Sequence, residues 1–266
     1  MKNILRQKKI QEYLSLHEKL TVEEAVSLFR ASPATIRRDF AEISSTGGIS
    51  RIRGGIRRNR NRFDELIPIA LREKWYSAEK RFLAAQAYQY IKPFKTFFID
   101  GGSTTTHLGV FFRENNQKII TNSLPLCNIL SEIFSAGGGP EIRMTGGLFY
   151  PESGLLLGTN AENSVADYHA DVAILSVRGI NSNGVYNHNE LIAGINRKMI
   201  ENADHTIIIA DHTKIGASAM NKVCSLDKIH ALFTIKTVEN QAELEKIRTA
   251  GVKVFDDCPF ENITEK

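Results

Sequence analysis

Short apolar segments alternate with longer stretches of helical spacing beyond residue 95, and this alternation constrains the fold more than any other feature of the sequence. Continuous apolar runs are typical of strands that are buried on both faces of a sheet. Runs of this kind separated by helices predict an α/β domain whose sheet is mostly parallel and covered on both faces. The seven expected strands are Phe97–Asp100, Lys118–Thr121, Ile142–Thr145, Val172–Ser176, Thr206–Asp211, Ala231–Ile235 and Val252–Phe255.

Glycine, hydroxyl and charged residues follow several of these expected strands at the point where each one ends. In an open α/β sheet, ligands bind outside the carboxyl ends of the strands, in the crevice where the strand order reverses. Small polar residues gathered there suit a polar, anionic small molecule. We therefore expect a small-molecule site formed by Asp100, Gly101, Gly102, Ser103, Thr104, Thr105, Thr121, Asn122, Ser123, Gly146, Gly147, Arg178, Asp211 and Lys214.

The loop from Gly101 to Thr106 gives the best physical case for anion binding. Its glycines let the backbone approach a ligand closely, and the N-terminus of a following helix offers unpaired amides and a favourable dipole. The loop matches neither a Walker A motif nor a dinucleotide fingerprint. A tight turn with a helix cap explains the same residues, so both interpretations stand at this point. Lys214 and Arg178 would add cations at the same edge.

A separate pattern of three short helices precedes this region. The first is expected around Ile10, Tyr13 and Leu14, which follow Ile4 and Leu5 at helical spacing. The second begins at the capping box Thr21-Val22-Glu23-Glu24. We expect its core face to consist of Val22, Ala25, Val26 and Phe29.

The third helix begins with Ser32 as its N-cap and Pro33 at its first position. Ile36, Phe40 and Ile43 form its apolar stripe, and a short loop at Arg30-Ala31 precedes it, as in a helix-turn-helix. With that stripe turned inward, other side chains of the helix must point outward, toward a major groove. The expected DNA contacts on this helix are Ser32, Thr35, Arg37 and Arg38.

A basic hairpin follows the third helix. After Gly47-Gly48, a period of two places Arg51 and Arg53 on one face of a strand, and a glycine turn at Gly54-Gly55 follows. Three helices and a basic hairpin are typical of a winged helix-turn-helix, so Arg51 and Arg53 join the expected DNA contacts. Each arginine taken singly is equally compatible with a solvated surface residue. The same surface could bind RNA or a protein, although the basic face lacks the aromatic residues on which single strands stack.

Charge is distributed unevenly between these regions. Residues 1–62 hold 14 of the 34 basic residues and 6 of the 30 acidic ones, while the rest of the chain is mildly acidic. A basic head on an acidic body is typical of a nucleic-acid-binding module joined to another domain. We expect a winged helix-turn-helix at 1–58, a linker at 59–78 and a ligand-binding domain at 79–266. Helical spacing from Phe63 to Ile91 predicts burial of Trp75, Phe82, Leu83 and Ala87.

Other classes of protein are disfavoured by what the sequence lacks. It has no apolar run of the length that a membrane helix needs and no signal-peptide pattern at its N-terminus. Its seven histidines show no metal-binding grouping, and Cys127, Cys224 and Cys258 are too scattered for a disulfide framework. The glycosylation pattern at Asn262-Ile263-Thr264 is attributed to chance. We expect no metal, no cofactor and no membrane partner, in a cytoplasmic protein.

The segment Ser32-Pro33-Ala34-Thr35-Ile36-Arg37-Arg38-Asp39-Phe40 and the wing residues Arg53-Gly54-Gly55 resemble the signature of DeoR-type bacterial transcriptional repressors. That family usually has His-Gly-Gly-Ala where this chain has Arg53-Gly54-Gly55-Ile56. Further matches extend the resemblance over nearly the full length, at Arg72, Glu79-Lys80, Asp100–Thr104, Thr121–Leu124, Gly146-Gly147, Leu157-Gly158 and Ala210–Lys214.

The resemblance implies a body with the ribose-phosphate isomerase and CoA-transferase type of fold that senses phosphorylated sugars. Arg178 stands where the ascorbate-utilisation repressors of the family carry a similar cation, which suggests an acidic or lactone-like sugar phosphate. We expect a repressor of a sugar or sugar-acid utilisation operon that binds double-stranded operator DNA as a homodimer or homotetramer. The alternative is an enzyme resembling a sugar-phosphate isomerase, in which Asp100, Asp211 and Lys214 perform acid–base chemistry.

Overall fold

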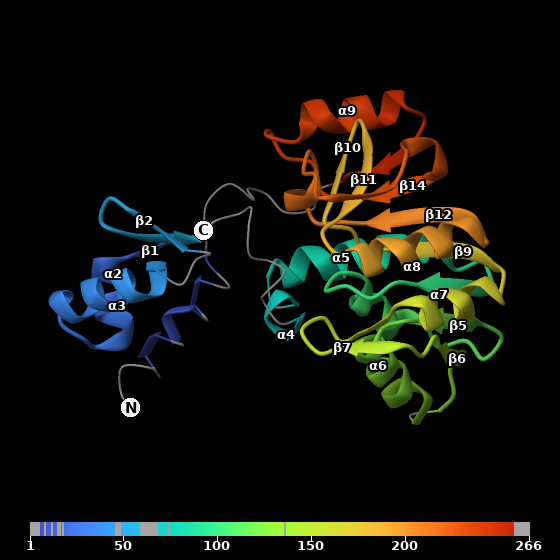
Figure 1. Ribbon diagram of the computed structural model, residues 1–266, viewed down its shortest axis with the longest axis horizontal. Helices are drawn as coiled ribbons and strands as arrows, with labels where there is room; N and C mark the ends of the chain where they lie inside the picture. The colour runs from blue at the N-terminus through green and yellow to red at the C-terminus, as the bar shows by residue number, and fades with distance from the viewer. Residues whose placement is uncertain are drawn as a thin grey trace. The chain divides into compact units, whose positions relative to one another are not determined.

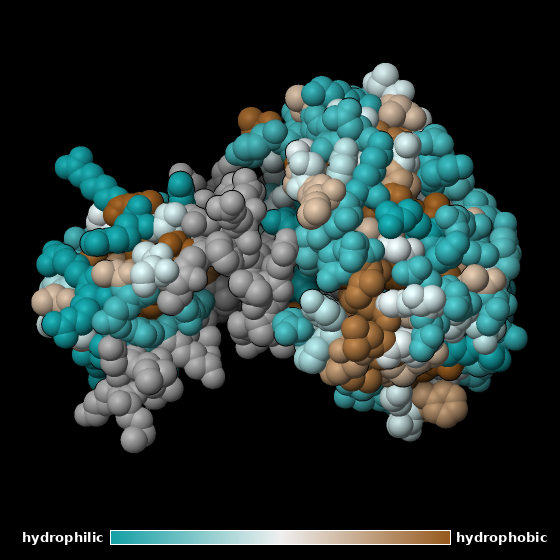
Figure 2. Space-filling model, viewed as in Figure 1, coloured by the Kyte–Doolittle hydropathy of each residue, from teal (hydrophilic) through white to brown (hydrophobic). Residues whose placement is uncertain are grey.

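The computed structural model describes residues 6–7, 9–11, 13–14, 17, 19–45, 49–58, 69–73, 75–135 and 137–257. Outside these residues lie Ile4, Leu5, Gly47-Gly48, positions 59–68 of the expected linker, Cys258 and Asn262-Ile263-Thr264. The described chain divides into two compact units, one ending at Tyr76 and the other beginning at Ser77. Figure 1 shows the elements of each unit, and Figure 2 shows the polar and hydrophobic surface of the same view.

The first unit is a helix-turn-helix with a three-stranded antiparallel wing. Residues 6–7, 9–11 and 13–14 are helical. The next elements are β1 (Lys19–Thr21), α2 (Val22–Phe29), α3 (Pro33–Ser45), β2 (Ile49–Ile52), β3 (Gly55–Arg58) and the short α4 (Ile69–Arg72). The strands lie in the order β1-β3-β2. The winged helix-turn-helix predicted from the sequence is therefore confirmed.

Local chemistry sets the helix boundaries in this unit. The Glu24 backbone amide donates to Thr21 Oγ1 at 3.2 Å, and the Thr21 amide donates back to Glu24 Oε2 at 2.8 Å, which completes the expected capping box. Arg30 ends α2 in the left-handed region at φ 49°. Ile10, Leu14, Leu20, Ala25, Ile36, Phe40, Ile43 and Ile56 form the core, and Val22, Val26 and Phe29 pack against it while only partly buried.

Two features of the wing differ from the sequence prediction. Strand β2 ends at Ile52, so Arg53 lies in the turn and shares no strand face with Arg51. The turn begins one residue early because Gly54 adopts a positive φ of 81°, which glycine tolerates without strain. Strand β1, which pairs with β3, was not predicted, since three residues before a helix cap give no periodicity.

The second unit is built on a seven-stranded sheet in which every pairing is parallel. Its order is β15-β14-β12-β9-β4-β5-β6. The bounds are β4 (Thr96–Ile99), β5 (Lys118–Thr121), β6 (Glu141–Met144), β9 (Ala170–Leu175), β12 (Ala203–Ile209), β14 (Ala231–Phe233) and β15 (Lys253–Phe255). Each of the seven predicted strands overlaps one of these, and the α/β class is confirmed.

Helices cover both faces of this sheet (Figure 1). One face packs against α5 (Ser77–Ile91), the 3-10 helix η1 (Thr105–Phe111) and α6 (Leu124–Ser135). The other face packs against α7 (Thr159–Ala166), α8 (Glu190–Glu201) and α9 (Gln241–Thr249). Neighbouring residues of a strand point to opposite faces, as with Phe97 and Phe98 of β4, which belong to the two different cores.

Two small antiparallel sheets complete the second unit, and neither was predicted. Strands β7 (Leu148–Tyr150) and β8 (Leu155–Leu157) form a hairpin. Strands β10 (Gly179–Asn181), β11 (Gly184–Asn187) and β13 (Asn221–Cys224) form the other sheet. The short 3-10 helices η2 (His212–Lys214) and η3 (Leu226–Lys228) lie in loops. The short segments of these two sheets lie outside the alternation of apolar runs and helices from which the parallel strands were predicted.

The helix expected from Phe63 to Ile91 is interrupted. In the described part it forms α4 and α5, with Tyr76 between them at a positive φ of 52°. Trp75, Leu83 and Ala87 are buried as expected, but Phe82 is only half-buried. No helix of the described residues has the length and apolar character that crossing a membrane requires.

An ion pair joins the first helical residues of the first unit to α3. The Arg6 guanidinium donates to both carboxylate oxygens of Asp39, at 2.5 and 3.2 Å, and Asp39 is only 1% exposed. Replacing Asp39 by Ala leaves the guanidinium without these acceptors, so we expect a loss of about 1–3 kcal/mol in the free energy of unfolding. Urea denaturation followed by the fluorescence of Trp75, the only tryptophan, checks this in the same unit.

Arg37→Ala is the matched control for that measurement, because Arg37 lies on the same helix with its side chain exposed. We expect its unfolding midpoint to stay within experimental error of the wild type. Equal destabilisation by both substitutions would contradict a stabilising role for the buried pair.

Candidate functional site

The N-terminal half of α3 presents the residues expected to contact DNA. Ser32 precedes the helix, and its Oγ accepts a hydrogen bond from the Thr35 amide at 3.3 Å. The two hydroxyls of Ser32 and Thr35 lie 2.8 Å apart. Arg37 and Arg38 are exposed, while Ile36, Asp39 and Phe40 are buried. Two adjacent cations therefore face solvent on a helix whose opposite side is fixed in the core.

The wing adds further cations near this helix in the same unit. Arg51 and Arg53 are exposed, on β2 and in the turn respectively. Sequence reasoning missed Arg57 on β3, which lies opposite Lys19 of β1 and Ser50 of β2. Because Ile56 faces the core, its neighbour Arg57 points to the other face. The alternation of Ile56 and Arg57 would have been the sequence signal for this position.

In the second unit, strand order reverses between β4 and β9. From β4 the chain proceeds outward to β5 and β6, and from β9 it proceeds the other way to β12, β14 and β15. A Cβ atom on Gly102 would lie 2.3 Å from the Ser176 Cβ, and one on Gly101 would lie 2.1 Å from Leu155 Cδ2. Glycine is therefore required at both positions so that the loop after β4 can pack closely. The expected loop does lie at the point of reversal, where ligands bind in such sheets.

Asp100 is buried directly after β4. Its Oδ1 accepts a hydrogen bond from Asn122 Nδ2 at 3.0 Å, while Asn122 Oδ1 accepts from the Gly101 amide at 3.0 Å. Burial raises the pKa of Asp100 to about 7, although the amides of Asn196 and Asn122 favour its charged form. Asp100 and Asn122 thus form one polar cluster that can donate or accept hydrogen bonds near neutral pH.

Most hydroxyls near this cluster hold the loops in shape. Thr105 Oγ1 donates to the Asp100 carbonyl at 2.7 Å, and Thr106 Oγ1 donates to the Gly102 carbonyl at 2.7 Å. Thr121 Oγ1 donates to the Ile99 carbonyl at 2.6 Å, and Ser123 Oγ accepts from the Leu126 amide at 3.3 Å. Thr104 is buried before η1. The expected helix after the loop is a seven-residue 3-10 helix.

Lys80 is the buried cation of this region. It lies in the first turns of α5, is 2% exposed, and its Nζ donates to Ser103 Oγ at 3.0 Å. Its positive charge also acts on Asp211, which follows β12. Strands β4 and β12 are the two neighbours of β9 in the sheet. Burial alone would raise the pKa of Asp211, but the charges of Lys214 and Lys80 outweigh it and lower that pKa. Lys80 therefore links the loops after β4 and β12.

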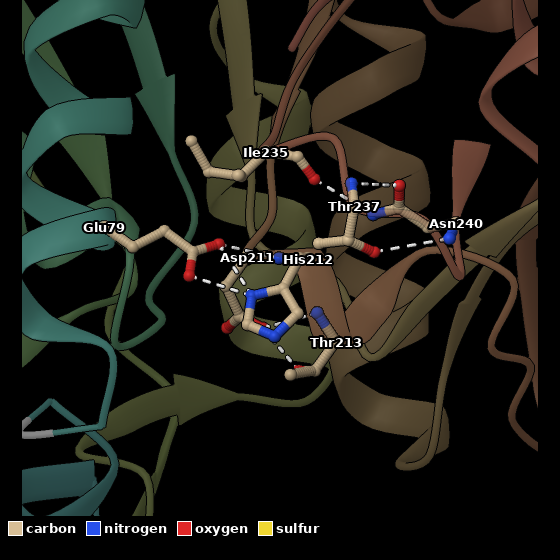
Figure 3. Close-up of polar contacts among 7 residues, drawn as sticks. All are labelled: Glu79, Asp211, His212, Thr213, Ile235, Thr237 and Asn240. Atoms are coloured by element: carbon tan, nitrogen blue, oxygen red, sulfur yellow. Dashed lines mark hydrogen bonds and ion pairs between the residues drawn. The ribbon is translucent and has the colours of Figure 1, made fainter. Parts of the chain in front are cut away.

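Glu79, the residue before Lys80, holds the loop after β12 from the same helix. Figure 3 shows its carboxylate pointing at His212, whose backbone amide donates to Glu79 Oε1 at 2.8 Å. The His212 ring places Nδ1 2.9 Å from Glu79 Oε2. Asp211 Oδ1 in turn accepts from the amide and the hydroxyl of Thr213. The backbone between Asp211 and Lys214 is thereby fixed.

Other expected site residues lie farther out. Lys214 ends η2 and is half-buried, and Arg178 is half-buried just before β10, where its backbone amide donates to the Tyr186 carbonyl at 3.0 Å. Gly146 and Gly147 follow β6, two strands from β4, and both are exposed. Among the described residues, a Cβ atom on Gly147 would meet Leu157 and Ala161, which lie outside the Asp100 cluster. In that part of the chain, no three His, Cys, Asp or Glu side chains gather closely enough to hold a metal ion.

The sequence did carry a signal for Lys80, although the helix was assigned only a packing role. Lys80, Leu83, Ala84, Ala87 and Ile91 recur at helical spacing and are all buried. A lysine at the end of such a stripe must have a buried partner or reach solvent. Its partners, Ser103 and Asp211, lie in loops more than twenty residues away in the sequence, so only the structure could identify them.

Comparisons with known proteins identify the two units. The model of the DeoR-like helix-turn-helix domain matches residues 6–62, and the model of the DeoR C-terminal sensor domain matches residues 76–236. A putative aga operon transcriptional repressor of Escherichia coli O157:H7 is 30% identical over 94% of this chain and 92% of its own length.

Other relatives also align over most of their length. The repressor GlcR of Bacillus subtilis is 28% identical over 92% of this chain and 93% of its own. The glycerol-3-phosphate regulon repressor of Escherichia coli K12 is 29% identical over 88% and 91%. Among solved structures, a ribose-5-phosphate isomerase in complex with phospho-erythronic acid aligns with a TM-score of 0.38 at 13% identity, over 52% of this chain and 53% of its own.

The raised pKa of Asp100 predicts a pH dependence of stability. Its ordinary pKa is 3.8, so the folded state holds the proton more tightly than the unfolded state does. The resulting stabilisation is complete below that ordinary value and is lost as the pH rises through about 7. Between pH 5 and 8, we expect wild-type stability to fall by roughly 2 kcal/mol relative to Asp100→Asn, measured by urea denaturation. Asp227→Asn, at an exposed position, should follow the wild type. Parallel pH profiles of wild type and Asp100→Asn would count against a buried, titrating Asp100.

Proposed function

The chain belongs to the DeoR family of transcriptional regulators, and on that premise we propose that it represses a sugar or sugar-acid utilisation operon under the control of a phosphorylated sugar. The first unit binds operator DNA, and the second binds the effector. The observation that carries the proposal is the buried Lys80 ammonium, held between Ser103 and Asp211 at the point where strand order reverses. A buried cation at such a place suits an anionic ligand.

Contacts from α3 and the wing would supply DNA binding. Arg37 and Arg38 are exposed at the part of a recognition helix that enters the major groove, where arginine pairs with guanine or with phosphate. Ser32 and Thr35 lie at the start of the same helix and can bond a phosphate. Arg51 and Arg53 reach from the wing toward the backbone of the duplex. The excess of positive charge in residues 1–62 favours this assignment.

The effector site has a cationic part and a neutral polar part. Lys80, Lys214 and Arg178 would bind the phosphate group, with Ser103, Thr104 and the Gly102 amide beside them, while the Gly101 amide stays bonded to Asn122. Asp100, Asn122 and Asp211 would bind sugar hydroxyls. Thr105, Thr121 and Ser123 shape the loops, and Gly146 and Gly147 contribute at most at the outer rim. The relative named for a glycerol-3-phosphate regulon supports a phosphorylated ligand.

We propose no enzymatic activity for this site. The relatives reported above are named as repressors, and the paired acid and base of the isomerase alternative would require Asp100 or Asp211 to reach substrate carbons. The absence of ribose 5-phosphate turnover by the purified chain tests this. Turnover that is lost in Asp100→Asn would overturn it.

Operators with two-fold symmetry are read by dimers, because two recognition helices then enter successive major grooves. We therefore propose that the working form is a homodimer, or a homotetramer built from dimers. Each subunit would present one α3 to one half-site. The effector would act by favouring one arrangement of the two DNA-binding units over another, since only differential binding shifts an equilibrium.

Arginine substitutions on α3 test the DNA interface. With duplexes that the wild-type chain selects from a random library, we expect Arg37→Ala and Arg38→Ala each to weaken binding at least tenfold, because a bidentate base contact is worth about 1–3 kcal/mol. Fluorescence anisotropy at several salt concentrations would give the affinity, with a shallower salt dependence wherever a phosphate contact is lost. Arg113→Ala, exposed in the second unit, is the control and should bind like the wild type. Unchanged affinity in both α3 variants would contradict the proposed interface.

Removal of the Lys80 charge tests the effector site. We expect at least one sugar phosphate of a panel to raise the melting temperature of the wild type by several degrees, and its unphosphorylated counterpart to leave it unchanged. A ligand at 100 times its Kd stabilises the folded state by about 2.7 kcal/mol, which is enough for such a shift. Lys80→Met should abolish that shift while DNA affinity without ligand stays unchanged. Ser103→Ala should reduce the shift, and Lys92→Met, at an exposed position of the same unit, should keep it. A full shift in Lys80→Met would refute the assignment.

A further inference from the structure

Strand β7 presents an uncharged, apolar surface on the second unit. Leu148, Phe149 and Tyr150 are all exposed, as are Met144 before the strand and Leu124 at the start of α6, with exposed fractions between 37 and 60%. Figure 2 shows a hydrophobic area in the region where Figure 1 labels β7. At about 200 Å² for a fully exposed large apolar side chain, these five residues expose roughly 450 Å². That exceeds half of the roughly 800 Å² that each partner contributes to a standard interface.

The outer edge of β7 has no paired strand among the described residues, because β7 pairs only with β8. Edge strands are normally protected against pairing by charged side chains. The edge strand β6 follows that rule, since Glu141 and Arg143 are exposed on it and bonded to each other at 2.7 Å. Strand β7 has no such protection, so its edge is open to pairing with another strand.

The side-chain pattern of the hairpin extends a buried face to this edge. Leu148 pairs with Leu157 and Tyr150 pairs with Leu155, so the two residues of each pair share a face of the hairpin. Leu155 and Leu157 are buried, whereas their partners on β7 remain exposed. A further strand placed beside β7 would bury Leu148 and Tyr150, in the same way that β7 and its neighbours bury Leu155 and Leu157 of β8.

The hairpin also forms a wall of the proposed effector site. The Leu156 amide donates to the Asn122 carbonyl at 2.8 Å, and the Leu124 amide donates to the Gly154 carbonyl at 2.9 Å. Leu155 packs on Gly101, where an added Cβ atom would lie 2.1 Å from Leu155 Cδ2 and 2.8 Å from Ser123 Cβ. The backbone that carries β7 is therefore bonded to the residues beside Asp100.

We propose that β7 pairs antiparallel with β7 of a second copy of this chain, so that the wall of the effector site is also the dimer interface. A second copy is the occupant that fits best, because a strand edge with the same apolar residues on both sides is self-complementary about a two-fold axis. DNA is a poor fit, since β7 carries no cation. The inference rests on the proposed function in one respect, namely that a two-fold operator calls for a dimer.

Charge placed on β7 tests this interface in the full-length chain. Leu148 and Phe134 are both 60% exposed, and Phe134 lies near the far end of α6, about 15 Å along that helix from Leu124. By sedimentation velocity over a concentration series, we expect a wild-type dimer whose dissociation constant rises at least tenfold in Leu148→Glu and stays unchanged in Phe134→Glu. A monomeric wild type, or a Leu148→Glu chain as dimeric as the wild type, would overturn the proposal.

If circular dichroism shows that Leu148→Glu does not fold, an intermolecular disulfide tests the proposed interface instead. A two-fold axis through the middle of β7 places residue 149 opposite its own copy, so Phe149→Cys should form an intermolecular disulfide under mild oxidation. Phe134→Cys and the wild type should not. Absence of the crosslink in Phe149→Cys overturns the proposal. Neither measurement uses DNA or sugar, so its outcome is independent of whether the operator or effector assignments hold.

Discussion

Burial of the Lys80 ammonium is the interaction on which the arrangement of the second unit depends. A desolvated cation costs several kcal/mol unless charged and polar partners compensate it. Here Ser103 Oγ accepts from Lys80, and Asp211 lies close enough for the lysine charge to lower its pKa. Because these partners follow β4 and β12, the N-terminal turns of α5 are held at the carboxyl ends of strands on either side of β9. Glu79 reinforces the same position through the His212 amide.

This arrangement suggests how ligand binding could be transmitted. An anion that joins Lys80 would change the balance of charge around Asp211 and Ser103, and the loop after β4 is packed against Leu155 of the β7–β8 hairpin. The hairpin is also hydrogen-bonded to Asn122. If β7 is the dimer interface, as we propose, a shift in this wall alters how two copies meet, which is the kind of differential contact that allosteric coupling requires.

Much of the fold could be predicted from the sequence, for identifiable reasons. The capping box at Thr21 and the Pro33 start of α3 are local signals, and the structure follows both. The seven parallel strands were recognisable because buried strands give continuous apolar runs. Strands β1, β7 and β10 were not, since these three-residue strands belong to small antiparallel sheets, outside the alternation of apolar runs and helices. The position of Arg53 depended on where Gly54 turns, which a period of two cannot reveal.

The candidate site could be predicted only where its residues follow strands of the sheet. Residues after strands were found because the carboxyl edge of a parallel sheet brings them together, as with Asp100 and Asn122. Lys80 and Glu79 were matched to the family but not assigned to the site, because their partners, Ser103 and His212, are distant in sequence.

The most direct test of Lys80 as the phosphate-binding residue is a crystal structure of the full chain with the sugar phosphate that stabilises it most. We predict a phosphate oxygen about 3 Å from Lys80 Nζ, at the carboxyl ends of β4 and β12. A phosphate bound elsewhere, with no phosphate oxygen within hydrogen-bonding distance of Lys80 Nζ, would contradict this assignment.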